Sequence, residues 1–254
     1  MSGNAATGGA YAGRANATRA NGDGGPAPLV AVVDYGAGNL VSIDQALTSV
    51  GASVALVRSA GDLAVTAADA LIVPGVGAAR PAMERLTDAG LVEPIRRWIA
   101  ERRPYLGICL GLQLLFEGSD EDGAVTLGVL AGRTAKLDGA PTLPHIGWNQ
   151  VVRRRPHPLF EGIAPAADFY FVHSYAGSLD AKNEDAALAD TTHGRSFVSV
   201  VAVDRLFGVQ FHPERSGIDG LRLLANFVGI VRSPGGWSRS AAWAADDAPA
   251  EVRA

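Results

Sequence analysis

The sequence contains a single cysteine among its 254 residues. One cysteine cannot form a disulfide within the chain and suits a reducing compartment, so we expect a cytoplasmic protein. Long apolar runs are also missing, because no stretch approaches the roughly 18 residues that a membrane-spanning helix needs. The net charge is only −4, with both signs scattered along the chain. The sequence therefore gives no electrostatic reason to expect a nucleic acid or a membrane as partner.

Two ligand-binding patterns are incomplete as well. Residues 36–39 read G-A-G-N, but Val41 stands where the dinucleotide-binding pattern G-x-G-x-x-G needs its third glycine, so we predict no NAD or FAD site. No paired spacing such as H-x-x-x-H relates the histidines His145, His157, His173 and His193. We therefore expect neither a metal ion nor another cofactor.

Residues 1–28 contain almost no large apolar side chains and are rich in glycine, alanine and asparagine. Such a segment cannot bury enough surface to offset its ordering entropy, so we predict a disordered extension. It lacks the apolar region of a secretory signal, and a transit peptide stays open as an alternative. Residues 29–232 are predicted to form one domain, and residues 233–254 a second disordered segment.

The first half of the domain alternates apolar runs with helix-like segments. Continuous apolar runs predict strands buried on both faces, and the alternation favours a parallel sheet with right-handed crossovers. The predicted strands cover residues 29–34, 54–57, 70–73 and 105–108. The predicted helices cover residues 40–50 and 83–102, the second interrupted near Gly90 and Pro94.

The second half of the domain is richer in strand-like segments, which we expect to add antiparallel strands to the sheet edge. They cover residues 127–137, 145–152, 169–175, 197–203 and 207–211. The sequence S-G-I-D at 216–219 resembles a capping box and predicts a final helix over residues 221–231. The expected fold is α/β, a mixed sheet with a parallel core, antiparallel edge strands and helices on both faces.

The single cysteine, Cys109, is the central residue of G-I-C-L-G at 107–111, between an apolar strand and a helix-like run. Nucleophile elbows have this pattern, in which flanking glycines allow a strained turn that exposes one side chain. The dipole of the following helix favours the thiolate, the reactive form of the side chain. A lone cysteine after a strand is more often a small buried side chain, but a core position does not need a sharp turn.

A histidine and a carboxylate follow far downstream, in F-H-P-E at 211–214. Pro213 biases His212 toward extended backbone, where alternate side chains point the same way, so Glu214 can orient the imidazole. An ordinary strand end with surface side chains is the simpler interpretation of these residues alone. Together with Cys109, they have the parts of a cysteine nucleophile with an oriented base.

Two further segments supply candidate groups around the cysteine. The sequence P-G-V-G at 74–77 ends a predicted parallel strand, at the sheet edge where α/β proteins bind ligands. Its backbone N–H groups could face a developing oxyanion, although an ordinary strand-to-helix turn explains the glycines equally well. Gln113 lies one helical turn after the cysteine, and its amide in an apolar run suggests a substrate contact. The candidate oxyanion-hole residues are Gly75, Val76, Gly77 and Leu110.

Over residues 29–231 the chain resembles the class I (triad) glutamine amidotransferases, a family with a flavodoxin-like mixed sheet. The elbow and the H-P-E segment are the residues that carry this resemblance. Three motifs make the chain similar to the glutaminase subunits of imidazole glycerol phosphate synthase: Y-G-A-G-N-L at 35–40, P-H-I-G-W-N at 144–149 and F-V-H-S-Y at 171–175. Arg215 stands where the family usually has lysine, and Ala176 where a bulkier residue is common.

The resemblance implies hydrolysis of glutamine to glutamate and ammonia. In that reaction Cys109 attacks the side-chain amide, His212 is the base and Glu214 orients it. The residues expected to bind the α-amino and α-carboxylate groups of glutamine are Gln113, Ser174 and Tyr175.

The resemblance also implies a partner. Subunits of this branch form a heterodimer with a (β/α)₈-barrel cyclase, which takes up the ammonia and forms imidazole glycerol phosphate and aminoimidazole carboxamide ribotide in histidine biosynthesis. They are nearly inactive without the cyclase and its nucleotide ligand, so we expect residues 74–77 to shift on activation. The expected interface residues are Asn39, Tyr170 and Arg215.

Two alternatives stay open. The chain could be the glutaminase subunit of another synthase, such as those for anthranilate or pyridoxal phosphate, although these relatives lack Y-G-x-G-N-L. It could also be a catalytically inactive homologue with a regulatory role, although all three triad residues are present. A general cysteine protease would fit the triad, but not Gln113 and the family motifs.

Overall fold

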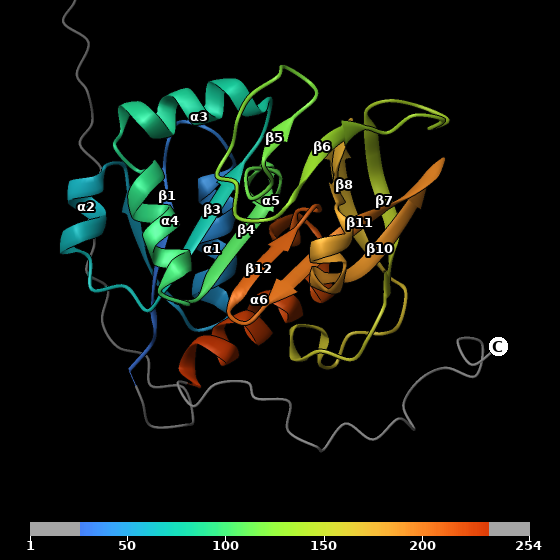
Figure 1. Cartoon of the computed structure of the whole chain (residues 1–254). Coiled ribbons are helices and arrows are strands. Elements are labelled where there is room, and N and C mark those ends of the chain that lie inside the picture. Colours follow the sequence, from blue (N-terminus) through green and yellow to red (C-terminus); the bar gives the residue numbers. More distant parts are fainter. Residues whose placement is uncertain (1–25, 234–254) are drawn as a thin grey trace, which may run out of the picture.

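The computed structural model describes residues 26–233, which form one large mixed sheet with helices on both faces (Figure 1). Most of the predicted extension at 1–28 and nearly all of the predicted segment at 233–254 lie outside the described residues, so their disorder stays a prediction. Within residues 26–233, no helix is both long enough and apolar enough to cross a membrane.

The N-terminal half consists of parallel strands joined by helices. Its strands are β1 (Leu29–Val33), β2 (Ser53–Val57), β3 (Ala70–Gly75) and β4 (Tyr105–Cys109). Its helices are α1 (Leu40–Ser49), α2 (Ala60–Val65), α3 (Ala79–Asp88), α4 (Val92–Ala100) and α5 (Leu110–Gln113). β1 pairs in parallel with β2 and β3, and β3 pairs in parallel with β4.

The C-terminal half consists mainly of antiparallel strands. They are β5 (Gly118–Ser119), β6 (Gly132–Lys136), β7 (His145–Arg153), β8 (Ala167–His173), β9 (Tyr175–Leu179), β10 (Ala187–His193), β11 (Arg195–Val203) and β12 (Leu206–Val209). Three short 3₁₀ helices, η1 (Pro158–Phe160), η2 (Ala181–Ala186) and η3 (Pro213–Arg215), and the long helix α6 (Gly217–Arg232) complete the described chain.

β12 joins the two halves because it pairs in parallel with β4 and antiparallel with β11. The large sheet has nine strands in the order β2-β1-β3-β4-β12-β11-β10-β7-β8, and a small sheet has the order β5-β6-β9. β4 and β12 are therefore neighbours near the middle of the large sheet. The chain leaves their carboxyl ends close together, which brings residues 109 and 212 to the same edge.

The helices cover the large sheet in two layers, because alternate residues of each buried strand point to opposite faces. On one face, Leu47 of α1 and Phe227 of α6 belong to the same buried cluster as Val32 of β1. On the other face, Leu86 of α3 belongs to the same cluster as Val33 of β1. The predicted α/β architecture, with a parallel core, antiparallel edge strands and helices on both faces, is confirmed.

The helical segment predicted over residues 83–102 was expected to be interrupted twice, and the structure has one of these two interruptions. α3 ends at Asp88 and α4 begins at Val92, so the break near Gly90 is present. The break at Pro94 is wrong, because Pro94 lies in the first turn of α4. The N–H groups of a first turn have no partner within the helix, so proline removes no hydrogen bond there.

Other local predictions are also corrected. Residues 127–137 contain β6 only at 132–136, and neither β10 nor the small sheet was predicted. The predicted capping box is wrong, since Ser216 makes no capping hydrogen bond to α6. Its hydroxyl instead donates to the carbonyl of His212 at 2.6 Å and accepts the N–H of Tyr170 at 3.0 Å. Ser216 thus ties the His212 segment to β8.

Candidate active site

Cys109 ends β4 in a strained backbone conformation, with φ 54° and ψ −108°. The strain lies on the cysteine itself, and the flanking glycines have a different role from the one predicted. A Cβ at Gly107 would lie 2.5 Å from the carbonyl oxygen of Gly111, and a Cβ at Gly111 would lie 1.7 Å from that of Val73. Glycine is needed at both positions because the turn lies directly against β3 and against itself.

The helix after the cysteine is too short for its dipole to stabilise the thiolate as predicted. α5 has only four residues, and the helix dipole grows from the summed alignment of many peptide units. The local environment of the sulfur is therefore determined mainly by side chains. The Sγ of Cys109 accepts a long contact from Gln210 Nε2 at 3.7 Å and faces the carbonyl of Val172 at 3.9 Å.

His212 and Glu214 are in direct contact, as predicted. His212 Nδ1 lies 2.9 Å from Glu214 Oε1, and the two side chains are 9% and 1% exposed. His212 has extended backbone, but Glu214 lies in η3, so a tight 3₁₀ turn and not strand alternation brings them together. The N–H of His212 also donates to the carbonyl of Tyr170 at 2.9 Å, which fixes its backbone against β8.

The charge state of His212 depends on its two neighbours. Burial alone would lower the pKa of His212, but hydrogen bonds and charge interactions with Cys109 and Glu214 outweigh burial and raise the pKa to about 10. Glu214 occupies Nδ1, which leaves Nε2 for the sulfur. At neutral pH the imidazole therefore holds a proton between a carboxylate and the nucleophile.

Glu214→Gln is expected to lower the pKa of His212 from about 10, because a neutral amide removes the favourable charge interaction. An NMR titration of the His212 imidazole measures this shift. Since the folded pKa lies above the ordinary value of about 6.5, protonation stabilises the fold below that pH, and the contribution is lost as the pH rises toward the folded pKa. Urea unfolding should therefore show a smaller loss of stability between neutral and alkaline pH in the variant than in the wild type.

Glu93→Gln is the matched control, because Glu93 pairs with Arg96 on the surface and is 72% exposed. It should leave the titration of His212 unchanged. The same pKa for His212 in wild type and Glu214→Gln would contradict the role given to Glu214.

The segment at 74–77 lies beside the nucleophile. Gly75 is the cross-strand partner of Cys109 in the β3–β4 pairing, and an added Cβ there would lie 3.0 Å from Cβ of Leu110. Val76 and Gly77 are exposed, and Gly77 has φ +90°. Gly75 and Leu110 therefore lie at the end of β4, Val76 and Gly77 follow directly after β3, and the oxyanion role of all four stays a prediction.

Tyr35 is a neighbour of this segment that sequence reasoning missed. Its hydroxyl would lie 2.1 Å from a Cβ at Gly75, and it is a buried group without a hydrogen-bond partner among the described residues. Burial first, and then the nearby Cys109, raise the pKa of Tyr35, so the phenol is neutral. A tyrosine two residues after the buried strand β1, at the same sheet edge, was the available signal.

Gln113 and Gln210 form a buried amide pair next to the cysteine. Gln113 Nε2 donates to the carbonyl of Tyr175 at 2.8 Å and to Gln210 Oε1 at 3.1 Å. Gln210 is fully buried, and its amide reaches the Sγ of Cys109. Sequence reasoning assigned no role to Gln210, although a glutamine within the apolar run at 207–211 was a signal.

The chain passes from the large sheet to the small one at Ser174, which separates β8 from β9, and Tyr175 is the first residue of β9. Both are half-buried, and the carbonyl of Ser174 accepts the N–H of Leu137 at 3.1 Å. Tyr175 contacts Gln113 through its backbone. The structure thus brings two of the three predicted glutamine-binding residues into direct contact.

The three predicted interface residues make contacts within the chain itself. Arg215 lies over the ring of Tyr170, 4.6 Å from its centroid, and Trp148 packs edge-on against the same ring. Asn39 is exposed, and its side chain caps α1 by accepting the N–H of Ser42 at 3.2 Å.

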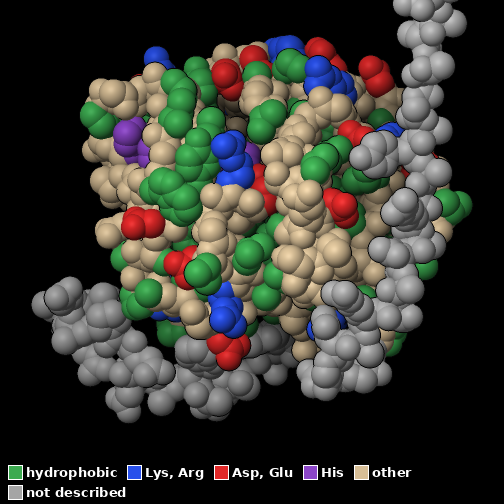
Figure 2. Space-filling view, turned by 180° about the vertical axis from the view of Figure 1, so that it is seen from behind, with side chains coloured by type: hydrophobic (Ala, Val, Ile, Leu, Met, Phe, Trp, Pro, Cys, Tyr) green, Lys and Arg blue, Asp and Glu red, His purple; other side chains and the backbone are tan. Residues whose placement is uncertain are grey.

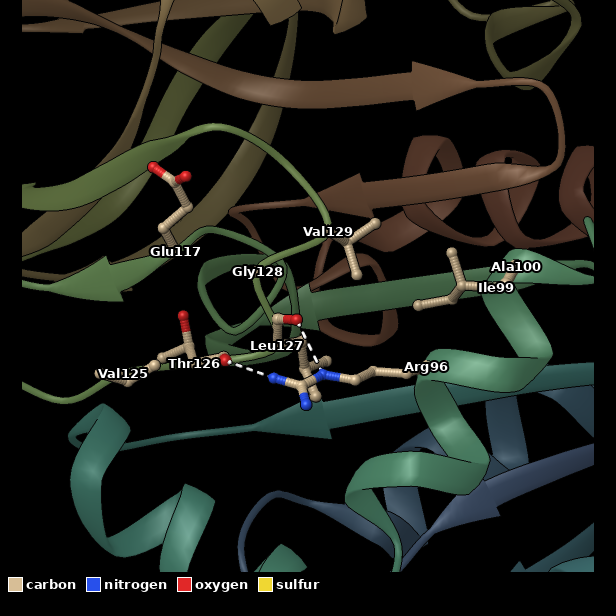
Figure 3. A pocket seen from close by; sticks show the side chains of 9 residues that line it. All are labelled: Arg96, Ile99, Ala100, Glu117, Val125, Thr126, Leu127, Gly128 and Val129. Atoms are coloured by element: carbon tan, nitrogen blue, oxygen red, sulfur yellow. Dashed lines mark hydrogen bonds between the residues drawn. The ribbon is translucent and has the colours of Figure 1, made fainter.

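A separate hollow of about 590 Å³ lies between α4 and the loop at 125–129 (Figure 3). Arg96 lines the hollow and donates to the carbonyls of Thr126 and Leu127 at 3.2 and 3.0 Å. No predicted site residue lines this hollow. The guanidinium of Arg96 thus joins α4 to this loop.

Comparisons with known proteins show to which family the chain belongs. Residues 31–230 match the family model of class-I glutamine amidotransferases. The chain is 46% identical over 208 residues to an imidazole glycerol phosphate synthase subunit HisH of Moorella thermoacetica, covering 81% of this chain and 97% of the relative. It is 48% identical over 204 residues to the subunit of the same name from Symbiobacterium thermophilum, covering 80% and 94%.

A solved glutamine amidotransferase structure has the same fold, with a TM-score of 0.62 at 20% identity over 80% of this chain and 98% of that one. The family model covers most of the described residues, including β4, α5 and the segment with His212 and Glu214. The chain therefore belongs to the class-I glutamine amidotransferase family.

Proposed function

We propose that the chain is the glutaminase subunit of imidazole glycerol phosphate synthase. It hydrolyses glutamine to glutamate and ammonia and delivers the ammonia to a cyclase subunit in histidine biosynthesis. The observation that carries this proposal is the buried arrangement of Cys109, His212 and Glu214 in a chain that matches nearly the full length of relatives with that name.

The reaction begins with attack on the substrate amide. The sulfur of Cys109 bonds to the side-chain carbonyl carbon of glutamine, while the thiol proton resides on Nε2 of His212. The carbonyl oxygen becomes an oxyanion, which the backbone N–H of Leu110 and the segment at 74–77 stabilise. Glu214 keeps the imidazole in orientation and compensates its positive charge.

Ammonia leaves in the second step. The tetrahedral intermediate collapses as His212 gives its proton to the departing nitrogen, and a thioester between Cys109 and the glutamyl group remains. Water then attacks the thioester, with His212 taking one of its protons. Glutamate is released, and the sulfur and the imidazolium return to their starting states.

Binding of the substrate head group is assigned to a different set of residues. Gln113 uses both N–H groups of its amide within the protein, which leaves Oε1 as an acceptor for the α-amino group of glutamine. Ser174 and Tyr175 border the same space and are assigned to the α-carboxylate.

An exposed apolar surface beside the site supports a partner. Ile146 and Trp148 of β7 and Ile218 of α6 are 60%, 58% and 83% exposed. Figure 2 shows hydrophobic side chains gathered over the half of the molecule where β7 and β8 lie. Tyr170 packs against Trp148, and Arg215 lies over the ring of Tyr170. The backbone N–H of Tyr170 donates to the hydroxyl of Ser216, and that of Arg215 donates to the carbonyl of His212. We assign this face to the (β/α)₈-barrel cyclase, because ammonia must pass to the partner without reaching bulk water.

Trp148→Ala is expected to weaken binding of the cyclase by about 10- to 100-fold, because exposed aromatic residues at the centre of an interface dominate its affinity. Titration calorimetry with purified cyclase measures the dissociation constant. Val65→Ala is the control, since Val65 is 84% exposed but lies on α2, near the opposite edge of the sheet. Equal affinities for the two variants would contradict the assignment of this face.

Nitrogen transfer is the experiment that tests the proposed function. The chain is mixed with the cyclase, the ribulosyl-formimino carboxamide nucleotide and glutamine, and formation of imidazole glycerol phosphate is measured. We expect product with glutamine as the only nitrogen source, whereas the cyclase alone should need an ammonium salt. Glutamine hydrolysis without transfer would indicate the subunit of another synthase, and neither activity would indicate an inactive homologue.

A further inference from the structure

Two histidines outside the triad face each other across paired strands. His145 of β7 and His173 of β8 are direct cross-strand partners, and His145 Nδ1 lies 3.0 Å from His173 Nε2. Both side chains are buried, at 3% and 7% exposure. Among residues 26–233, no group of His, Cys, Asp and Glu side chains is arranged to hold a metal ion. The hydrogen bonds of the two imidazoles show what the pair does.

The donor and acceptor of each hydrogen bond follow from one backbone carbonyl. His173 Nδ1 lies 2.8 Å from the carbonyl oxygen of Tyr175, which can only accept, so Nδ1 carries a hydrogen. His173 Nε2 then accepts from Nδ1–H of His145. The remaining nitrogen of His145, Nε2, accepts from Asn149 Nδ2 at 3.1 Å, and the same Nδ2 also donates to the carbonyl of Thr192 at 2.9 Å.

Each of the four ring nitrogens in this series of hydrogen bonds has a matching donor or acceptor only when both imidazoles are neutral. Burial lowers the pKa of His145 to about 4 and that of His173 to about 3, with further lowering by neighbouring histidines including His193. His193 stacks on His145 with ring centroids 4.0 Å apart, but it bonds elsewhere, to the carbonyl of Thr142. At neutral pH each nitrogen of the pair therefore has a fixed role.

The carbonyl of Tyr175 connects this pair to the candidate active site. It accepts from His173 and also from Gln113 Nε2, whose second N–H donates to Gln210. Gln210 in turn reaches the sulfur of Cys109. The histidine pair is thus the outer support of the amide pair beside the nucleophile.

We propose that His145 and His173 are positioning residues of the glutamine site, which hold the Tyr175 carbonyl and thereby fix the amide of Gln113 with Oε1 toward the substrate head group. The inference rests on the proposed function, because it assigns that Oε1 to glutamine. Without the Nδ1–H of His145, His173 Nε2 would be a buried acceptor without a partner, and the ring would turn away from Tyr175. Gln113 would then lose the fixed carbonyl that orients it.

Matched substitutions at His145 test the proposal. Asparagine and leucine have similar size, but only His145→Asn keeps an N–H near the position of Nδ1. The rate of Cys109 labelling is measured with the cyclase present, using 6-diazo-5-oxo-L-norleucine, an electrophile with the amino-acid head group of glutamine. We expect His145→Leu to slow this labelling by about 10-fold or more, and His145→Asn to stay within about threefold of the wild type.

Labelling by iodoacetamide distinguishes a defect in substrate positioning from a general structural defect, because only the general defect would change its rate. Iodoacetamide has no amino-acid head group, so its rate should be the same in all three proteins if only substrate positioning is altered. His193→Leu is a control, because it changes the ring that stacks on His145. Cys109 of this variant should be labelled by both reagents at the wild-type rate. If His145→Leu does not fold, Asn149→Leu removes the donor to His145 Nε2 and should slow the glutamine-like reagent selectively.

The outcomes separate this inference from the function on which it rests. Selective slowing by His145→Leu, with recovery in His145→Asn, supports the positioning role. Equal slowing of both reagents, or no difference between leucine and asparagine, overturns it. A wild-type cysteine that reacts with iodoacetamide but not with the glutamine-like reagent would instead overturn the proposed glutaminase function, and the positioning role with it.

Discussion

Cys109→Ala is expected to reduce glutamine hydrolysis in the complex with the cyclase by about 10⁴-fold or more, because the reaction then has no nucleophile. The fold should remain, since the sulfur makes only long contacts, at 3.7 and 3.9 Å. Alanine keeps the Cβ, so the strained backbone at this position is no worse than in the wild type. Glutamate release measured over time gives the rate, and circular dichroism monitors the fold.

Cys109→Ser is the matched variant, which shows whether the loss of hydrolysis comes from the missing thiolate or from the smaller side chain of alanine. A hydroxyl preserves the size and the hydrogen-bonding groups of the side chain, but at neutral pH it is a far weaker nucleophile than a thiolate. Both variants should bind glutamine with nearly unchanged affinity, because the head-group contacts lie on Gln113 and its neighbours. Glutamate release by Cys109→Ala at more than a few per cent of the wild-type rate would show that another group performs the chemistry.

Gly111→Ala is expected to have the largest effect on stability. Its Cβ would lie 1.7 Å from the carbonyl oxygen of Val73, which belongs to the backbone of β3 and cannot move as a flexible side chain would. Relieving this overlap requires β3 and the elbow to separate, and we expect a loss of about 4 kcal/mol or more in the free energy of unfolding. Urea denaturation measures the change.

Gly229→Ala is the control for glycine substitution. Gly229 lies within α6, and nothing lies within 4 Å of a Cβ placed there. Alanine should stabilise this helix by about 0.5–1 kcal/mol, since glycine is the more costly residue in a helix interior. A Gly111→Ala protein as stable as the wild type would contradict the close approach of β3 and the elbow.

The three candidate triad residues could be chosen from the sequence because their signals are local. Cys109 lies within a short motif, and His212 and Glu214 are separated by one residue. The physical reasons were less predictable. Gly107 and Gly111 were expected to provide backbone freedom, but they allow close packing, which depends on where β3 lies. The contact of Glu214 with His212 arises from a 3₁₀ turn, although extended chain was expected.

The rest of the site depends on pairings that no short segment of sequence contains. The contact between His145 and His173 requires β7 and β8 in one register, and a shift of either strand by one residue would turn its histidine to the other face. Gln210 reaches Gln113 and Cys109 because β12 lies next to β4, which a linear pattern cannot show. The same limit explains why β10 and the small sheet were missed.

Glutamate release from glutamine is the measurement that tests the central claim most directly. It is made with the purified chain alone, and then with the cyclase and its nucleotide ligand. We predict little release by the chain alone and a large increase in the complex, because we expect residues 74–77 to shift and complete the oxyanion hole only when the cyclase is bound. A complex that releases no glutamate, with all components folded and bound, would contradict the claim that this site hydrolyses glutamine.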